Sequence, residues 1–296
     1  MNDVHEPGAI GVIGGSGLYE MDGLENIERV ALETPYGAPS DAYITGMLDG
    51  HRMVFLPRHG ASHSVLPHEI NFRANIWGMK KLGVDRLLSV SAVGSMKEAI
   101  VPGHLVLVDQ FIDRTRQRAA TFYGDGVVAH VPLADPICPA LRESLNDHAS
   151  AVPVDVHHRG TYICMEGPQF STRAESFLYR SWGVSVIGMT NMPEAKLARE
   201  AEICYATIAL ATDYDCWHEE EESVTVEAVL ETLRKNVNNA KTLIRATVAD
   251  AAERSTCALC GTAARTSIMT PLDAISASRK ADLEPILRHF DGKPNA

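Results

Sequence analysis

The stretch from Ile203 to Trp217, ICYATIALATDYDCW, changes character halfway along. Its first half is apolar, a pattern typical of a strand that is buried on both faces of a parallel sheet. Two carboxylates, Asp213 and Asp215, follow at once, at the position where open α/β sheets bind ligands beyond the carboxyl ends of their strands. The alternative is a turn in which both Asp side chains bond to their own backbone, and these residues alone favour neither interpretation.

Length, charge and cysteine content limit the classes of function. The chain has 296 residues, enough for one large α/β domain or two smaller ones. Its formal net charge of −11 argues against a nucleic-acid surface, which would show a clustered basic face. Six cysteines are scattered instead of spaced as a disulfide framework, which fits a reducing cytoplasm. No basic segment precedes an apolar run and no run reaches membrane-spanning length, so we expect a soluble cytoplasmic protein without a membrane partner.

A glycine turn follows the first predicted strand. The segment AIGVIGGSG, Ala9 to Gly17, places Ser16 between two glycines, and such a turn can hold an anion. Dinucleotide binding would need G-x-G-x-x-G at the start of a helix, and the glycine spacing here differs. No Gly-Lys-Ser/Thr follows either, so neither a nicotinamide site nor a Walker-type phosphate loop is predicted.

Two further strands lead into segments that could bind an anion. The strand at residues 53–56 runs into Pro57-Arg58-His59-Gly60, where the guanidinium offers a planar fork of donors matched to phosphate and the imidazole can add another. The strand at residues 86–90 is expected to end in a small-residue turn, Ser91-Ala92-Val93-Gly94-Ser95. Three such segments in one chain point to one shared phosphate.

A metal site is the competing interpretation of the histidines. His59, His63 and His68 lie close in sequence, but zinc ligands usually come at tighter helical or knuckle spacings. We therefore favour the oxyanion site, and we expect His68 to be a partly buried imidazole with satisfied hydrogen bonds. The C-x-x-C motif at Cys257 and Cys260 has no second pair for zinc and is interpreted as structural or incidental.

The rest of the chain alternates between strand and helix patterns. Apolar residues at helical spacing mark one face of a long helix at residues 223–247. The pattern predicts strands and a hairpin within 27–56, strands at 101–112, 161–165, 184–187 and 203–210, helices at 71–82, 139–149 and 193–202, and short helices within 270–290. We expect one domain over residues 1–250, with a helical tail, residues 251–296, packed on it.

Several motifs occur together in a fixed order. They are Gly14-Gly15-Ser16-Gly17, Pro57-Arg58-His59-Gly60, Glu166-Gly167-Pro168-Gln169-Phe170-Ser171, Met189-Thr190 with Pro193-Glu194, and Ala211-Thr212-Asp213-Tyr214-Asp215-Cys216-Trp217. In this combination the chain resembles the nucleoside phosphorylase superfamily, most closely its methylthioadenosine phosphorylase branch. The resemblance runs from about residue 10 to residue 247.

The resemblance implies a fold and a reaction. The fold is a single α/β domain with a mixed, partly closed central sheet, or partial barrel, flanked by helices and assembled as a homotrimer or a dimer of trimers. The reaction is pentosyl transfer in purine and methionine salvage. In it, phosphate displaces adenine from 5′-methylthioadenosine to give 5-methylthioribose 1-phosphate, without a metal or organic cofactor. The residues that would hold phosphate are Ser16, Arg58, His59, Ser91, Ala92 and Thr190.

The resemblance also implies how the nucleoside is held. Met189 would lie under the ribose, and Phe170, Asp213, Tyr214 and Asp215 would form the base pocket. Asp213 would protonate the departing purine, with its pKa raised by burial beside Phe170. Asp215 would accept a hydrogen bond from the exocyclic amine, which favours adenine over a 6-oxopurine.

Substrate selectivity is expected to depend on other positions. Val226, Val229 and Leu230 would line the pocket for an apolar 5′ group, and Ser171 matches a position that tunes specificity. His130 matches a residue that reaches into the neighbouring subunit's site. The remaining alternatives are a 6-oxopurine or methylthioinosine phosphorylase, a hydrolytic nucleosidase, which would not need the phosphate turns, and a nucleoside-binding module without activity.

Overall fold

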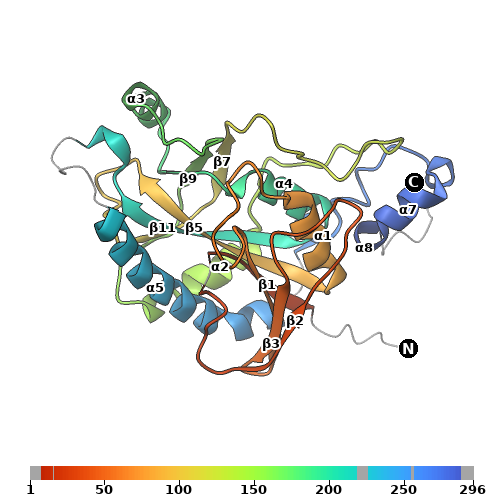
Figure 1. The fold of residues 1–296 in the computed structure, drawn as a ribbon, viewed down its shortest axis with the longest axis horizontal. Coiled ribbons are helices and arrows are strands. Elements are labelled where there is room, and N and C mark those ends of the chain that lie inside the picture. The colour runs from red at the N-terminus through yellow and green to blue at the C-terminus, as the bar shows by residue number, and fades with distance from the viewer. Residues whose placement is uncertain (1–7, 16, 219–225, 255–256, 288–296) are drawn as a thin grey trace.

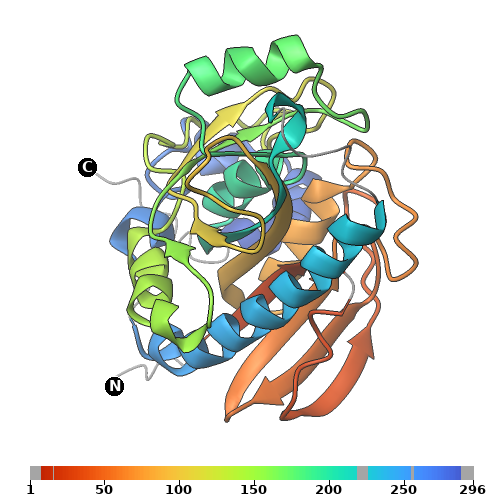
Figure 2. The ribbon, with the colours of Figure 1, turned by 90° about the vertical axis from the view of Figure 1, so that its left-hand side faces the viewer.

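A branched sheet between two layers of helices forms the centre of the molecule (Figure 1). The computed structural model describes residues 8–15, 17–218, 226–254 and 257–287, and within the long helix it describes side chains only from residue 231 onward. Helices α1 (Phe72–Lys81) and α4 (Asn191–Glu200) pack together on one face. Helices α2 (Pro139–Asp147) and α5 (Val226–Glu253) cover the other face, where α5 runs across β11, β5, β1 and β4 (Figure 2). The α/β fold class expected from the sequence is confirmed.

The sheet has eleven strands in the order β2-β3-β4-β1-β5-β10-β9-β7, with β11 joined to β5 and β6, and β6 joined to β8. The strands are β1 (Ala9–Gly14), β2 (Leu24–Val30), β3 (Tyr43–Leu48), β4 (His51–Pro57), β5 (Val84–Ser95), β6 (Leu105–Leu107), β7 (Gln110–Asp113), β8 (Val156–His157), β9 (Thr161–Cys164), β10 (Val186–Gly188) and β11 (Cys204–Asp213). Among these strands the two ends of the branches, β7 and β8, do not pair with each other. The sheet is therefore not closed, although its branches through β11 and through β10 come together where β6 and β7 follow each other along the chain, separated by Val108 and Asp109. The expected mixed sheet is confirmed, and its partial closure is limited to this point.

The central strand β5 is longer than its sequence predicts. It runs through residues 91–95, where a turn was expected, because partners are available along its whole length. It pairs with β1 in its first half, with β11 up to Gly94, and with β10 at Gly94 and Ser95. A Cβ at Gly94 would lie 3.0 Å from Asp213 Oδ1 and 3.1 Å from Ile187 Cγ2. Small residues at this point therefore permit close strand approach, and they do not mark a turn.

One predicted strand is divided in the structure, and one predicted hairpin is confirmed. The strand predicted at 101–112 is divided into β6 and β7, because the chain leaves β11 at Val108 and Asp109 N–H then donates to the Gly160 carbonyl at 3.2 Å. The hairpin expected around Asp49 and Gly50 is confirmed between β3 and β4, with both turn residues at positive φ.

Local sequence sets the helix ends. The Asn71 side chain caps α1 by accepting from Ala74 N–H at 3.2 Å, and Thr172 with Glu175 forms a capping box at the start of α3 (Arg173–Ser181). The C-terminal segment contains α6 (Ala258–Gly261), α7 (Ala277–Asp282) and α8 (Glu284–Leu287). The single-turn 3₁₀ helices are η1 (Ala149–Ala151), η2 (Asp215–Trp217) and η3 (Leu272–Ala274).

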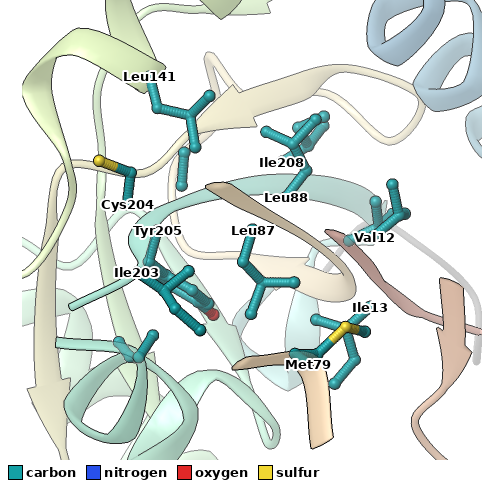
Figure 3. Packing of buried hydrophobic residues seen from close by; sticks show 14 of the residues in the cluster. Val12, Ile13, Met79, Leu87, Leu88, Leu141, Ile203, Cys204, Tyr205 and Ile208 are labelled. Atoms are coloured by element: carbon teal, nitrogen blue, oxygen red, sulfur yellow. The ribbon is translucent and has the colours of Figure 1, made fainter. Parts of the chain in front are cut away.

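The core lies on both faces of β5 and β11 (Figure 3). Successive residues of a strand point to opposite faces, so Leu88 and Ile208 pack on one side of the sheet and Leu87 and Tyr205 on the other. Each such side chain contributes about 1.5–3 kcal/mol when it is fully buried. Within the described ranges, no helix combines the length and apolarity needed to cross a bilayer.

Candidate active site

A cavity of about 410 Å³ opens where the carboxyl ends of several strands meet. Strands β1, β4, β5 and β11 run parallel, with Gly14 opposite Pro57 and Ile13 opposite Ser89, so the residues that follow them converge at one edge. Most residues predicted to bind ligand line this cavity: Arg58, His59, Ser91, Ala92, Phe170, Met189, Thr190, Asp213 and Asp215. A volume of this size is typical of small-molecule sites.

The Arg58 side chain is fixed by a buried ion pair. Its guanidinium is 2% exposed and donates to Glu194 through Nε at 2.7 Å and Nη2 at 3.0 Å. Nη2 also meets Ser89 Oγ, and Nη1 donates to the Val90 carbonyl at 3.0 Å. The planar fork expected to bind phosphate is thus taken by Glu194. Among the residues that the structure describes, one Nη1 hydrogen is left for a ligand oxygen.

Opposing effects act on the charge of Arg58. Burial disfavours the charged guanidinium, but Glu194 at hydrogen-bond distance outweighs burial and raises the pKa of Arg58. Glu194 is fully buried and also accepts from Ser89 Oγ at 2.7 Å and Tyr205 Oη at 2.8 Å. Arg58 is therefore held rigidly, and its charge is largely balanced before any ligand arrives.

His59 contributes an acceptor. Its Nδ1 lies 2.8 Å from the Val65 carbonyl, which can only accept, so the hydrogen of the neutral ring is on Nδ1 and Nε2 carries a lone pair. Burial, reinforced by the Arg58 charge, lowers the pKa of His59 to about 4. At neutral pH the ring can accept a hydrogen bond from a phosphate hydroxyl. This role differs from the donor role expected from the sequence.

The hydroxyl groups of Ser91 and Thr190 also line the cavity. Ser91 Oγ lies 3.1 Å from Thr190 Oγ1 and 3.1 Å from Tyr162 Oη. Thr190 is the N-cap residue of α4, and the helix is kinked two residues later, at Met192. Ala92 offers its backbone from the exposed edge of β5. Together with Arg58, these groups form a wall suited to an oxyanion.

Asp213 lines the same cavity from the end of β11, where it pairs with Gly94 of β5. Its Oδ1 accepts from Asp215 N–H at 2.8 Å, and its Oδ2 accepts from Thr212 Oγ1 at 2.7 Å. Burial raises the pKa of Asp213 despite these bonds, and the Asp215 charge adds to the increase. The source of burial differs from the expected one, because Phe170 is 83% exposed and lies at the cavity mouth. With its pKa raised, the Asp213 side chain keeps its proton to higher pH than an ordinary Asp side chain does.

Asp215 is held in place by two serines. Ser171 Oγ donates to its carboxylate at 2.9 Å, and Ser176 Oγ, from α3, donates at 2.5 Å. The backbone of Asp215 is left-handed, with φ at 53°, which turns the side chain back toward the cavity lined by Asp213. The sequence did not identify Ser176, because nothing in an isolated helix pattern shows that a serine faces a distant carboxylate.

Comparisons with known proteins agree with this geometry. The family model described as the phosphorylase superfamily matches residues 9–249. The chain belongs to the phosphorylase superfamily. It is 61% identical to the S-methyl-5′-thioadenosine phosphorylase of Geobacter sulfurreducens over 282 residues, which cover 95% of this chain and 98% of that protein.

Solved structures give the same result. This phosphorylase-superfamily chain matches the crystal structure of a methylthioadenosine phosphorylase from an Antarctic soil metagenomic library with a TM-score of 0.89 and 48% identity, over 95% and 99% of the two chains. A mutant adenosine/methylthioadenosine phosphorylase of Schistosoma mansoni, in complex with methylthioadenosine, matches with a TM-score of 0.75 and 37% identity, over 83% and 92%.

Some residues predicted for the site lie elsewhere. Tyr214 is not among the described residues that line the cavity, and its hydroxyl donates to the Glu98 carbonyl at 3.2 Å. His130 is exposed on the long connection after β7, where its N–H donates to the Ser267 carbonyl. His68 is partly buried as expected, but its Nδ1 has no partner in the described part of the chain, contrary to the expectation. Ser171 lines a neighbouring cavity of about 530 Å³.

Four of the predicted site positions fall outside the described part of the chain. Ser16 and the side chains of Val226, Val229 and Leu230 lie outside the described residues. Leu233 and Val237, farther along α5, do line the cavity. The sequence analysis assigned them to the core. Apolar residues that line a cavity have the same helical spacing as apolar residues that pack in the core, so the pattern cannot separate the two.

Sequence reasoning did not identify Arg118, which lies in the connection after β7. Its side chain is 1% exposed and joins the two loops that flank the cavity. Nη1 donates to the carbonyls of Met189 at 2.7 Å and Met192 at 2.6 Å, and Nη2 donates to the Glu166 carbonyl at 2.6 Å. Arg118 does not line the cavity among the described residues. It is therefore a positioning residue.

Replacing Arg118 by Met should lower kcat/KM by about 10²-fold, the scale expected when reacting groups shift by about 1 Å. The loss should fall on kcat and on the KM for phosphate together, because Met189 and Thr190 would lose their anchor. Steady-state kinetics measures it, with the exposed Arg29→Met as the matched control. Unchanged kinetics in a folded Arg118→Met protein would remove Arg118 from this role.

Proposed function

We propose that the protein catalyses the phosphorolysis of 5′-methylthioadenosine to adenine and 5-methylthioribose 1-phosphate. The observation that carries the proposal is one cavity lined both by groups suited to an oxyanion, Arg58, Ser91 and Thr190, and by the Asp213–Asp215 pair. The names of the relatives support the choice of substrate. Breaking an N-glycosidic bond to a purine requires stabilisation at both ends of the substrate, and this arrangement can supply it.

The chemistry follows from the side chains. Phosphate held by Arg58, Ser91 and Thr190 would attack the anomeric carbon as the bond to adenine breaks, and its negative charge would stabilise the positive charge on the sugar. The neutral His59 would accept from the phosphate hydroxyl. Asp213 would give its proton to the purine. The hydrogen lost by phosphate replaces that proton, so the reaction is balanced without metal or organic cofactor.

Adenine release with and without phosphate tests the proposal directly. We expect release from methylthioadenosine to require phosphate, with slower release from adenosine and little release of base from methylthioinosine or inosine. Phosphate-independent release would indicate a nucleosidase. Equal or greater activity on the two inosines would indicate a 6-oxopurine phosphorylase, and binding of methylthioadenosine without release would leave a binding module.

Replacing Asp215 by Asn should change the preferred base. Asn can donate to the oxygen of a 6-oxopurine, while it weakens the bond that Asp215 would accept from the adenine amine. Because a hydrogen bond to a charged group contributes about 1.5–3 kcal/mol, the kcat/KM ratio of methylthioadenosine to methylthioinosine should fall about 10-fold or more. Comparing both substrates on one variant corrects for any loss of folded protein, and an unchanged ratio would exclude Asp215 from base selection.

We further propose a cytoplasmic homotrimer or dimer of trimers in which His130 completes a neighbouring site. The support is the exposed position of His130 on a long surface connection. In the same proposal residues 251–296 form a tail packed on a domain of residues 1–250, as favoured by the bond from Trp77 Nε1 to the Asp282 carbonyl at 2.8 Å. Light scattering measures the assembly, and activity regained on mixing His130→Ala with Asp213→Asn protein would support a shared site.

A further inference from the structure

Three cysteines from distant parts of the chain meet in the core. Cys138 precedes α2, Cys204 begins β11 and Cys260 lies in α6. Their sulfur atoms all lie within 4.8 Å of one another, and all three residues are buried. Figure 3 shows Cys204 beside Leu141 of α2, on the side of the sheet opposite to Tyr205. The cluster therefore joins a strand, a helix and the C-terminal segment.

Hydrogen-bonded backbone fixes these positions. Cys138 N–H donates to the Tyr205 carbonyl at 2.8 Å, which ties the start of α2 to β11. Cys260 N–H and Gly261 N–H both donate to the Cys257 carbonyl, at 3.0 and 2.8 Å, so Cys257 and Cys260 form a tight C-x-x-C turn. The sequence offered no second pair for this motif. The fold supplies one, because Cys138 and Cys204 come from elements far away in the chain.

Two arginines lie beside the cluster. Arg86 and Arg254 line a small cavity with Cys138 and Cys204, and each guanidinium is paired with a carboxylate, Arg86 with Asp85 and Arg254 with Asp250. A thiolate is the form that binds soft metal ions.

We propose that Cys138, Cys204 and Cys260 bind one thiophilic divalent cation, with zinc as the first candidate, and that Cys257 or a water molecule completes its coordination. Tetrahedral zinc with bonds of about 2.3 Å to sulfur needs sulfur atoms about 3.8 Å apart, a spacing within the 4.8 Å limit of this cluster. Clustered cysteines in a reducing compartment more often bind metal or act in catalysis than form disulfides.

The role of this metal would be structural. Cys204 and Asp213 stand at opposite ends of β11, nine residues apart and so about 30 Å along an extended strand. The ion would fasten the C-terminal segment to β11 and α2 without contact with the reacting groups. It does not depend on the proposed phosphorolysis, and its failure would leave that proposal intact.

Metal analysis of the full chain tests the site. Protein loaded with zinc and then desalted should retain one zinc per chain, measured by atomic emission. Cys260→Ser should weaken retention at least about 10-fold. The matched control is Cys164→Ser, which changes an equally buried thiol outside the cluster and should retain zinc. Equal retention by Cys260→Ser and the unaltered protein would overturn the assignment.

A second measurement needs no variant, in case Cys260→Ser fails to fold. Cobalt(II) added to the unaltered protein should produce thiolate-to-cobalt charge-transfer absorption and the intense visible bands of a tetrahedral site. Chelation should then remove the bands and lower the melting temperature. No bound cobalt, or two missing thiols when the denatured, unreduced protein is titrated, would overturn the proposal, the latter because a disulfide would occupy the sulfur atoms.

Discussion

Adenine release by an Asp213→Asn variant is expected to be about 10²- to 10⁴-fold slower, the usual contribution of a general acid. Asn keeps the shape of Asp213, and its one oxygen can still accept from Asp215 N–H while its amide nitrogen faces Thr212 Oγ1, but it has no acidic proton to give to a departing purine. Single-turnover release at saturating phosphate measures the chemical step. An undiminished rate would remove Asp213 from the mechanism.

The pH profile gives an independent check of the same assignment. Because burial raises the pKa of Asp213, its acid form persists to higher pH than for an ordinary Asp, and it is lost as the pH rises through that value. Activity should therefore decline on the alkaline side, and Asp213→Asn should abolish that limb. The exposed Asp273→Asn is the matched control and should keep both rate and profile.

Breaking the buried Arg58–Glu194 pair should give the second large effect. Removal of either partner leaves the other charge buried without compensation, at a cost of about 3–5 kcal/mol. Both Arg58→Met and Glu194→Met should lower the midpoint of denaturant unfolding. Glu194→Met should also weaken phosphate binding, because Arg58 then loses the partner that orients its remaining donor.

The double variant separates stability from function. Arg58→Met with Glu194→Met should be much more stable than the sum of the single effects, because two apolar side chains replace a desolvated pair. Phosphorolysis should remain lost, since no guanidinium faces the anion. Additive stability losses would show that the two residues do not act as a pair, and retained activity would show that Arg58 is not needed for phosphate.

Much of the fold could be predicted because its signals are local. The buried strand ending in Asp213, the capped helix after Asn71 and the turn at Asp49 each depend on nearby residues, and the structure contains all of them. The extension of β5 beyond Ser91 could not be predicted, since it depends on strands β10 and β11, which come about a hundred residues later.

The candidate site also combines residues that have a local sequence signal with residues whose role depends on distant partners. The phosphate-wall residues that the structure describes could be predicted from motifs, and they line one cavity. Their supports could not, because the Pro193-Glu194 motif does not show that Glu194 pairs with Arg58, and Ser176 has no sequence signal that it meets Asp215. The donor fork of Arg58 was assigned to ligand for the same reason: a sequence does not reveal which acceptors are already inside the protein.

Strand β5 has a consequence for substrate choice. Ser91 lies beside the anion position, and Gly94, three residues on, pairs with Asp213. Three residues of extended chain measure about 10 Å, so one inextensible segment sets the gap between the attacking oxygen and the acid. We therefore expect this spacing to select nucleosides whose sugar spans the distance between the two groups, independently of substrate polarity.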